Sequence, residues 1–184
     1  IQTDSLTPTK TAEEVIRGWN TIRDRRITEA EWGSDDLAAI VRTALGSYPV
    51  WVGWDIIDQI GKHVQHVIPQ ATVVYIVTDE GIYREARRVQ SSLENTGIPA
   101  HIFILPSGEQ NKSLENVEQV YKWLAGRKAE RGHLVLAVGG GVVGDLAGFV
   151  ASTYLRGMPF AIVPTSLLGM MDASIGGKTA VDLP

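Results

Sequence analysis

The chain contains no cysteine among its 184 residues, so disulfide bonds and thiolate metal sites are excluded. Positive charge is not in excess either: 17 Lys and Arg stand against 21 Asp and Glu, a net charge of −4, which excludes a general basic surface for nucleic acid. Long apolar runs are missing, because glycines and Asp145 interrupt the stretch from Leu134 to Val150, and the N-terminus shows no basic-then-apolar signal pattern. These absences favour a cytoplasmic protein.

The start of the chain differs from the rest. Residues 1–3 fit the end of a strand, residues 5–23 carry helix-start signals with apolar residues at helical spacing, and residues 24–36 are charged and indicate a linker. A chain that begins in mid-strand and stops without a closing element is expected to be a piece of a longer protein. We therefore predict an N-terminal extension and linker over residues 1–35 and one domain over residues 36–184.

Strands and helices are predicted to alternate along the second part. A hairpin is expected over residues 41–53, with Gly46 and Ser47 as its turn. Beyond it the sequence predicts helices over 56–68, 81–97, 113–132 and 141–152, and strands over 71–78, 100–106, 133–138 and 158–164. Because several of these strands are apolar on both faces, the predicted fold class is α/β, a Rossmann-like, mostly parallel sheet with helices on both faces.

The most informative stretch is HLVLAVGGGVVGDLAGFVAS, residues 133–152, in which a buried strand leads through glycines into a helix. Gly139 to Gly144 fits G-x-G-x-x-G in the strand–turn–helix context that binds a dinucleotide pyrophosphate. The ordinary fingerprint also places an acid on the next strand, but that strand ends in Pro164-Thr165-Ser166. The alternative interpretation is that the glycines only permit close packing of helix on strand.

Acidic residues do follow the earlier strands. Asp79 closes one strand, and Glu109 follows another within the loop 106–113, where Glu109 and Lys112 could clasp a ribose or an adenine edge. Alone, that loop reads as a polar connection with Ser113 as a helix cap. Asp145 could bond ligand hydroxyls or only cap its helix. Together these positions predict a nucleotide site of a non-standard kind.

Further polar residues lie toward the end of the sequence. Arg156 suits phosphate, although a lone arginine is commonly a surface residue, and Asp172 and Lys178 could orient a polyol and its phosphate. The GGKT tetrapeptide fails as a P-loop, because Asp172 occupies the position of the first glycine. The four histidines show no metal-ligand spacing, and His63 and His66 are expected at the surface.

The run GGGVVGDLAGFVASTYLRGMPFAIVPTSLLGMMDASIGGKTAVDLP resembles 3-dehydroquinate synthase, and the likeness extends through SYPVWVG, VTDEGIY and PSGEQNKS. It thus covers residues 41–184. The resemblance implies a carbon–oxygen lyase that converts 3-deoxy-D-arabino-heptulosonate 7-phosphate to 3-dehydroquinate and phosphate in the shikimate pathway of aromatic amino acid biosynthesis. It also implies NAD as a catalyst that transiently oxidises the substrate before phosphate elimination, a divalent metal (zinc or cobalt), and a homodimer.

The resemblance also implies roles for individual residues. Those implied to bind the cofactor are Asp79, Ser107, Gly108, Glu109, Gln110, Asn111, Lys112, Gly140, Gly141, Val142, Val143, Gly144, Asp145, Thr165, Ser166 and Lys178. Asp172 and Lys178 would lie between nicotinamide and substrate, and Arg156 would reach substrate phosphate in the neighbouring subunit. Three departures from the family pattern are Gly81 in place of asparagine, Ser166 in place of threonine, and Trp54 in place of a smaller or polar residue.

The family's metal ligands lie in a helical C-terminal domain, and no counterpart is found within these 184 residues. We therefore expect the fragment to be inactive alone. Residues 1–19 resemble the tail of a shikimate kinase, which would make the parent a kinase–synthase fusion, or they are an ordinary extension. Competing interpretations are a related sugar-phosphate cyclase, a polyol dehydrogenase of the glycerol dehydrogenase type, and a non-catalytic nucleotide-binding module.

Overall fold

The computed structural model describes residues 36–43 and 46–183, and the chain divides into two compact units, residues 1–56 and 57–184. The predicted elements within residues 1–35 lie outside the described residues. In the first unit, β1 (Leu37–Thr43) pairs antiparallel with β2 (Gly46–Trp51), which confirms the predicted hairpin. Its turn was predicted wrongly, because Gly46 already pairs with Thr43 in the ladder, where the Thr43 hydroxyl donates to the Gly46 carbonyl at 3.0 Å.

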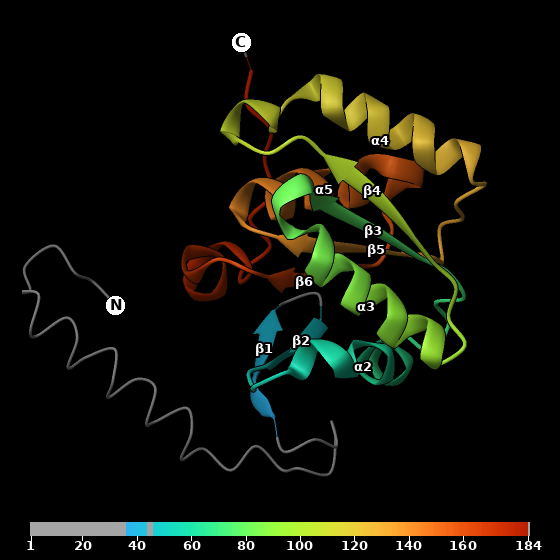
Figure 1. The fold of residues 1–184 in the computed structure, drawn as a ribbon, viewed down its shortest axis with the longest axis vertical. Coiled ribbons are helices and arrows are strands. Elements are labelled where there is room, and N and C mark those ends of the chain that lie inside the picture. Colours follow the sequence, from blue (N-terminus) through green and yellow to red (C-terminus); the bar gives the residue numbers. More distant parts are fainter. Residues whose placement is uncertain (1–35, 44–45, 184) are drawn as a thin grey trace, which may run out of the picture. The chain divides into compact units, whose positions relative to one another are not determined.

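The second unit is built on a four-stranded parallel sheet (Figure 1). Its strands are β3 (Val74–Asp79), β4 (Ala100–Leu105), β5 (Leu134–Gly139) and β6 (Phe160–Pro164), in the spatial order β4-β3-β5-β6. All three pairings are parallel, as the doubly apolar strands predict. The predicted α/β class is thereby confirmed.

Helices cover both faces of this sheet. A short 3₁₀ turn, η1 (Ile56–Gln59), leads into α2 (Ile60–Val67), and the longer helices are α3 (Tyr83–Asn95), α4 (Leu114–Gly126) and α5 (Gly141–Thr153). Successive side chains of β3 point to opposite faces of the sheet and so belong to two separate cores. Val74 and Ile76 pack with α2 and α3, whereas Tyr75 and Val77 pack with α4 and α5. The sheet is therefore buried between two helical layers.

Local chemistry sets the ends of the helices. The Ser113 hydroxyl accepts from the Asn116 amide at 3.4 Å and so caps α4, as the sequence predicted. This helix ends at Gly126 rather than at residue 132, because Lys128 takes the left-handed conformation with φ 54°. Among the described residues no helix has the length and apolar character that a membrane span requires.

Candidate functional site

The strand order creates a switch point at the carboxyl edge of the sheet. From β3 the chain crosses to β4 on one side, then returns past β3 to β5 and continues outward to β6. The carboxyl ends of β3 and β5 are therefore neighbours from which the chain departs in opposite directions, which is where such sheets build ligand sites. Asp79 ends one of these strands and Gly139 ends the other. A carboxylate thus ends the strand adjacent to the one that leads into the glycine turn.

The glycine turn joins β5 to the N-terminus of α5. Gly140 is the N-cap in an extended conformation, and its carbonyl accepts the first intrahelical bond from the Gly144 amide at 3.0 Å. The amides of Gly141, Val142 and Val143 thus form the first turn of a 13-residue helix, where backbone donors and the helix dipole favour an anion.

The glycines of this segment divide into two groups by what a side chain would meet. A Cβ at Gly139 would lie 2.7 Å from Val143, and one at Gly144 would lie 2.6 Å from Ile162 of β6, so these two positions require close packing. At Gly141, by contrast, a Cβ would meet only Ala173 at an ordinary 3.8 Å, and the residue does not have a positive φ. Packing therefore accounts for Gly139 and Gly144 and leaves Gly141 without a structural requirement.

Asp79 is fixed at the switch point by two hydrogen bonds. Its Oδ1 atom accepts from the Gly81 amide at 2.8 Å and from the Ser107 hydroxyl at 3.3 Å. Both contacts hold the carboxylate at the end of β3 and bring the loop after β4 beside it. Gly81, one of the departures from the family pattern, thereby contributes a backbone donor where its side chain cannot.

The loop after β4 includes η3 (Glu109–Asn111), and hydrogen bonds from its own side-chain amides hold its shape. Gly108 has φ 114°, which only glycine adopts readily, while Gln110 and Asn111 donate to the Ser107 carbonyl at 3.4 and 3.0 Å. The two amide side chains therefore shape the loop. Its backbone and Glu109 are exposed beside the strand ends.

Lys112 is the electrostatic centre of the site. Its ammonium lies 3.0 Å from Glu109, 3.5 Å from Asp145 and 3.5 Å from Asp182, and its side chain is only 14 % exposed. The hydrogen bond to Glu109 is the main cause that raises the pKa of Lys112 above its ordinary value, with smaller contributions from Asp182 and Asp145 working against burial. Lys112 thus joins the loop after β4 to the first turns of α5.

Asp182 is a member of this cluster that the sequence did not reveal. Its amide donates to the Lys112 carbonyl at 2.7 Å, and it forms an isolated parallel bridge with Ser113. The contact joins residues far apart in the sequence, and no local pattern marks it. Only the tertiary fold could have identified it.

The segment after β6 lies against the glycine turn. The Thr165 amide donates to the Gly139 carbonyl at 2.9 Å, and the Ser166 hydroxyl accepts from the Gly169 amide at 3.1 Å. A Cβ at Gly140 would lie 3.3 Å from that hydroxyl, so Ser166 borders the turn directly. The predicted cofactor residues of the glycine turn, of α5 and of the segment after β6 are therefore brought together.

Asp172 and Lys178, which were predicted to orient a polyol and its phosphate, form an exposed ion pair with each other. Asp172 belongs to a π-helical turn, η5 (Gly169–Ala173), whose last residue is the neighbour of Gly141 described above. The pair is thus carried by a segment that reaches the glycine turn.

Arg156 lies apart from these residues. It follows α5, which runs away from the carboxyl edge, and precedes the start of β6, so it occupies the opposite edge of the sheet. Leu155, Arg156 and Gly157 all have positive φ, at 51°, 68° and 109°. Within one chain Arg156 therefore cannot join the site, and its predicted role requires a second subunit.

The chain was compared with known proteins. A family model described as the 3-dehydroquinate synthase N-terminal domain matches residues 102–184. The 3-dehydroquinate synthase of Symbiobacterium thermophilum is 46% identical over 140 residues, which are 74% of this chain and 38% of that protein. That of Streptococcus suis is 50% identical over 114 residues, 60% of this chain and 32% of that protein. Residues 102–184 are thus similar to the N-terminal part of 3-dehydroquinate synthases.

Two solved structures resemble the fold. A 2-deoxy-scyllo-inosose synthase aligns with a TM-score of 0.73 at 23% identity, over 79% of this chain and 40% of that chain, and shows the fold alone. A 2-epi-5-epi-valiolone synthase from Streptomyces hygroscopicus, with NAD+ and Zn2+ bound, aligns with a TM-score of 0.57 at 31% identity, over 62% of this chain and 33% of that chain. The chain spans 38% of the length of the first curated 3-dehydroquinate synthases that it matches.

The family-model match over residues 102–184 includes every predicted site residue except Asp79. Within the described residues, no three His, Asp or Glu side chains are grouped as a metal site would need. His63 was expected at the surface but is buried, because it lies on the side of α2 that includes the core residue Val64. His66 is exposed, as predicted.

Proposed function

We propose that residues 36–184 are the NAD-binding domain of a 3-dehydroquinate synthase, which converts 3-deoxy-D-arabino-heptulosonate 7-phosphate to 3-dehydroquinate and phosphate. The observation that carries the proposal is Gly141, which neither packing nor φ requires, at the first turn of a helix beside Asp79 on the adjacent strand. The curated relatives that match at 39–50% identity bear this enzyme's name. Residues 1–35 would be a linker with either an ordinary extension or the end of a fused shikimate kinase.

The residues present fit a dinucleotide. Because Gly141 has no side chain, a pyrophosphate could approach the first-turn amides of α5, and Asp79 on the neighbouring strand would offer its carboxylate to a ribose. Lys112 would hold Glu109 and Asp145 beside this ligand. Glycine at 141 is favoured for the approach of a phosphate, since a Cβ there would stand between the ligand and the amides.

The chemistry that NAD would supply when bound is reversible hydride transfer with the substrate carbon that bears a hydroxyl, and the transient ketone formed there would make the neighbouring C–H proton acidic enough for phosphate elimination. This chain's contribution is to bind and orient. Thr165 and Ser166 border the glycine turn, and the Asp172–Lys178 pair would hold substrate oxygens next to the nicotinamide. Arg156 would contact the substrate phosphate bound by the partner subunit of a cytoplasmic homodimer.

The described residues do not fit the divalent metal that the family resemblance implies, since they contain no suitable cluster of ligands. We place the zinc or cobalt ligands in the remainder of a longer protein, which agrees with the 38% coverage of the relatives. The fragment should therefore show no turnover by itself. Formation of 3-dehydroquinate by the pure fragment would contradict this part of the proposal.

Calorimetric titration with NAD tests the binding role. Gly141→Ala should weaken binding at least tenfold while leaving the melting temperature unchanged, because its Cβ meets nothing closer than 3.8 Å. Gly132→Ala is the matched control, since a Cβ there has open space far along the chain from the turn. Equal NAD affinity in the unsubstituted chain and in Gly141→Ala would refute the site. If neither protein binds NAD, the same titration on the longer protein distinguishes a wrongly assigned site from one that needs a further domain.

A further inference from the structure

The outer face of α3 carries a concentration of arginines. Arg84, Arg87 and Arg88 stand at i, i+3 and i+4, on the side of the helix opposite the buried residues Ala86, Val89 and Leu93. Like charges at this spacing repel each other on an isolated helix. A helix face that needed only solvation would mix positive and negative side chains. Glu85 and Glu94 belong to the same helix, but neither lines the surface hollow that the three arginines share.

These arginines line a hollow of about 330 Å³ on the surface of the second unit. Ser91 and Asn95 continue the lining along α3, and Asp58 of η1 closes it from the other side. The lining thus carries three guanidinium groups and one carboxylate, together with the hydroxyls of Ser91 and Ser92 and the side-chain amide of Asn95. Its formal charge leaves an excess of two positive charges.

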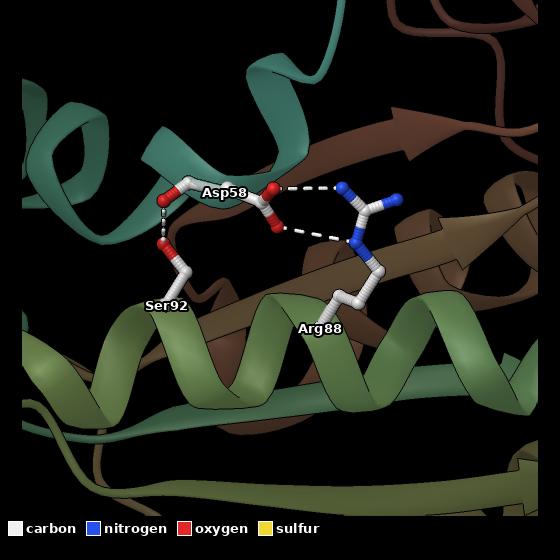
Figure 2. A network of polar contacts seen from close by, with 3 residues as sticks. All are labelled: Asp58, Arg88 and Ser92. Carbon is white, nitrogen blue, oxygen red and sulfur yellow. Dashed lines mark hydrogen bonds and ion pairs between the residues drawn. The ribbon is translucent and has the colours of Figure 1, made fainter.

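The hollow is pre-organised on the side of Arg88 (Figure 2). Arg88 donates from Nε to Asp58 Oδ1 at 3.1 Å and from Nη2 to Oδ2 at 2.7 Å, a two-point contact that fixes the plane of the guanidinium. The Ser92 hydroxyl donates to the Asp58 carbonyl at 2.8 Å, and so ties the backbone of η1 to α3. Arg88 is therefore held in place before any ligand arrives.

We propose that this hollow binds a small phosphate monoester as its dianion. Two negative charges balance the charge excess of the lining. Since Nε and Nη2 of Arg88 donate to Asp58, the paired hydrogen bonds to phosphate oxygens would come from the planar guanidinium groups of Arg84 and Arg87. The volume accommodates a phosphate group with a few carbon atoms attached, at the small end of ligand pockets. This site lies on the outer face of α3, so it does not depend on the nucleotide site proposed at the carboxyl edge of the sheet.

The test uses the chain labelled with ¹⁵N-arginine and titrated with glycerol 3-phosphate, with glycerol and sodium chloride at matched ionic strength as controls. The Nε–H signals of Arg84, Arg87 and Arg88 should move together and saturate. The double variant Arg84→Gln/Arg87→Gln should weaken binding at least tenfold. A variant that removes two positive charges elsewhere, Lys122→Gln/Arg131→Gln, should bind as the parent does.

Asp58→Asn provides a second test, because a lining that served only to stabilise the fold would not gain affinity for phosphate when this carboxylate is removed. It removes one negative charge from the lining and keeps an oxygen for Arg88, so affinity for glycerol 3-phosphate should rise roughly threefold. Signals that respond equally to chloride, or equal weakening in the Lys122→Gln/Arg131→Gln control, would overturn the proposal. A short glutamate-rich peptide that binds there and is not displaced by glycerol 3-phosphate would also overturn it, in favour of a protein partner.

Discussion

Removal of the Lys112 ammonium is the perturbation that best tests the geometry of the proposed nucleotide site. In Lys112→Met the three carboxylates of Glu109, Asp145 and Asp182 lose the cation that lies 3.0, 3.5 and 3.5 Å from them. Asp145 matters most, since its side chain is only 20 % exposed and water replaces the lost partner poorly.

The expected cost follows from the burial of each partner. The pairs with the exposed Glu109 and Asp182 contribute about 0.5 kcal/mol or less each, as exposed ion pairs do. A charge-assisted hydrogen bond to a partly buried carboxylate adds about 1–2 kcal/mol. We therefore expect a loss of about 2 kcal/mol in the free energy of unfolding, which corresponds to a fall in melting temperature of about 4–8 °C for a domain of this size.

Lys122→Met is the matched control. Lys122 pairs with Glu118 at 2.7 Å, but both side chains are exposed, at 72% and 64%, so the deletion should cost about 0.5 kcal/mol or less. Urea unfolding of the parent and both variants at neutral pH measures the two losses. Equal losses in the two variants, or a Lys112→Met protein as stable as the parent, would refute the assigned geometry. Lys112→Arg should recover part of the difference, because it restores the charge.

Three further predictions concern packing and pH. Gly61→Ala should lower the free energy of unfolding by about 2 kcal/mol, since its Cβ would lie 2.3 Å from a backbone oxygen of α3. The control Gly126→Ala, where a Cβ has open space, should be neutral or slightly stabilising, and equal melting temperatures of the two variants would contradict this reasoning. Because the pKa of Lys112 is raised, its stabilisation should be complete below the ordinary value of 10.5 and decline at higher pH, so the stability gap between parent and Lys112→Met should narrow in alkaline urea titrations. Because hydrogen bonding to Arg88 lowers the pKa of Asp58, that pair should stabilise the fold above the ordinary value of 3.8 and lose this effect as the pH falls further, and an Arg88→Gln protein with an unaltered acid transition would argue against it.

The parallel sheet and its helices were predictable because their signals are local. Apolar strands such as Val74–Asp79 and the periodic helix Tyr83–Asn95 show their state within one window of sequence. The hairpin turn was misplaced because Gly46 resembles a turn residue, and only pairing with Thr43 reveals it as part of a strand. Turn identity there depends on register, which a glycine alone does not specify.

The candidate site was predictable in its parts but not in its connections. The glycine turn and Asp79 were identified from their places after strands, whereas their adjacency follows from the order β4-β3-β5-β6, which no local pattern encodes. Burial of His63 and the participation of Asp182 likewise depend on contacts between distant segments. The position of Arg156 at the opposite edge also emerges only from the direction of α5.

The contact between Lys112 and Asp182 has a consequence for biosynthesis. A ribosome adds about 5–20 residues per second, so about 4–14 seconds separate the synthesis of these two residues, which lie about 70 positions apart. During that interval the strands β3, β4 and β5 can already pair, while the loop around Lys112 lacks one of its acidic partners. The nascent chain can therefore pair these three strands before the ion-pair cluster around Lys112 is complete.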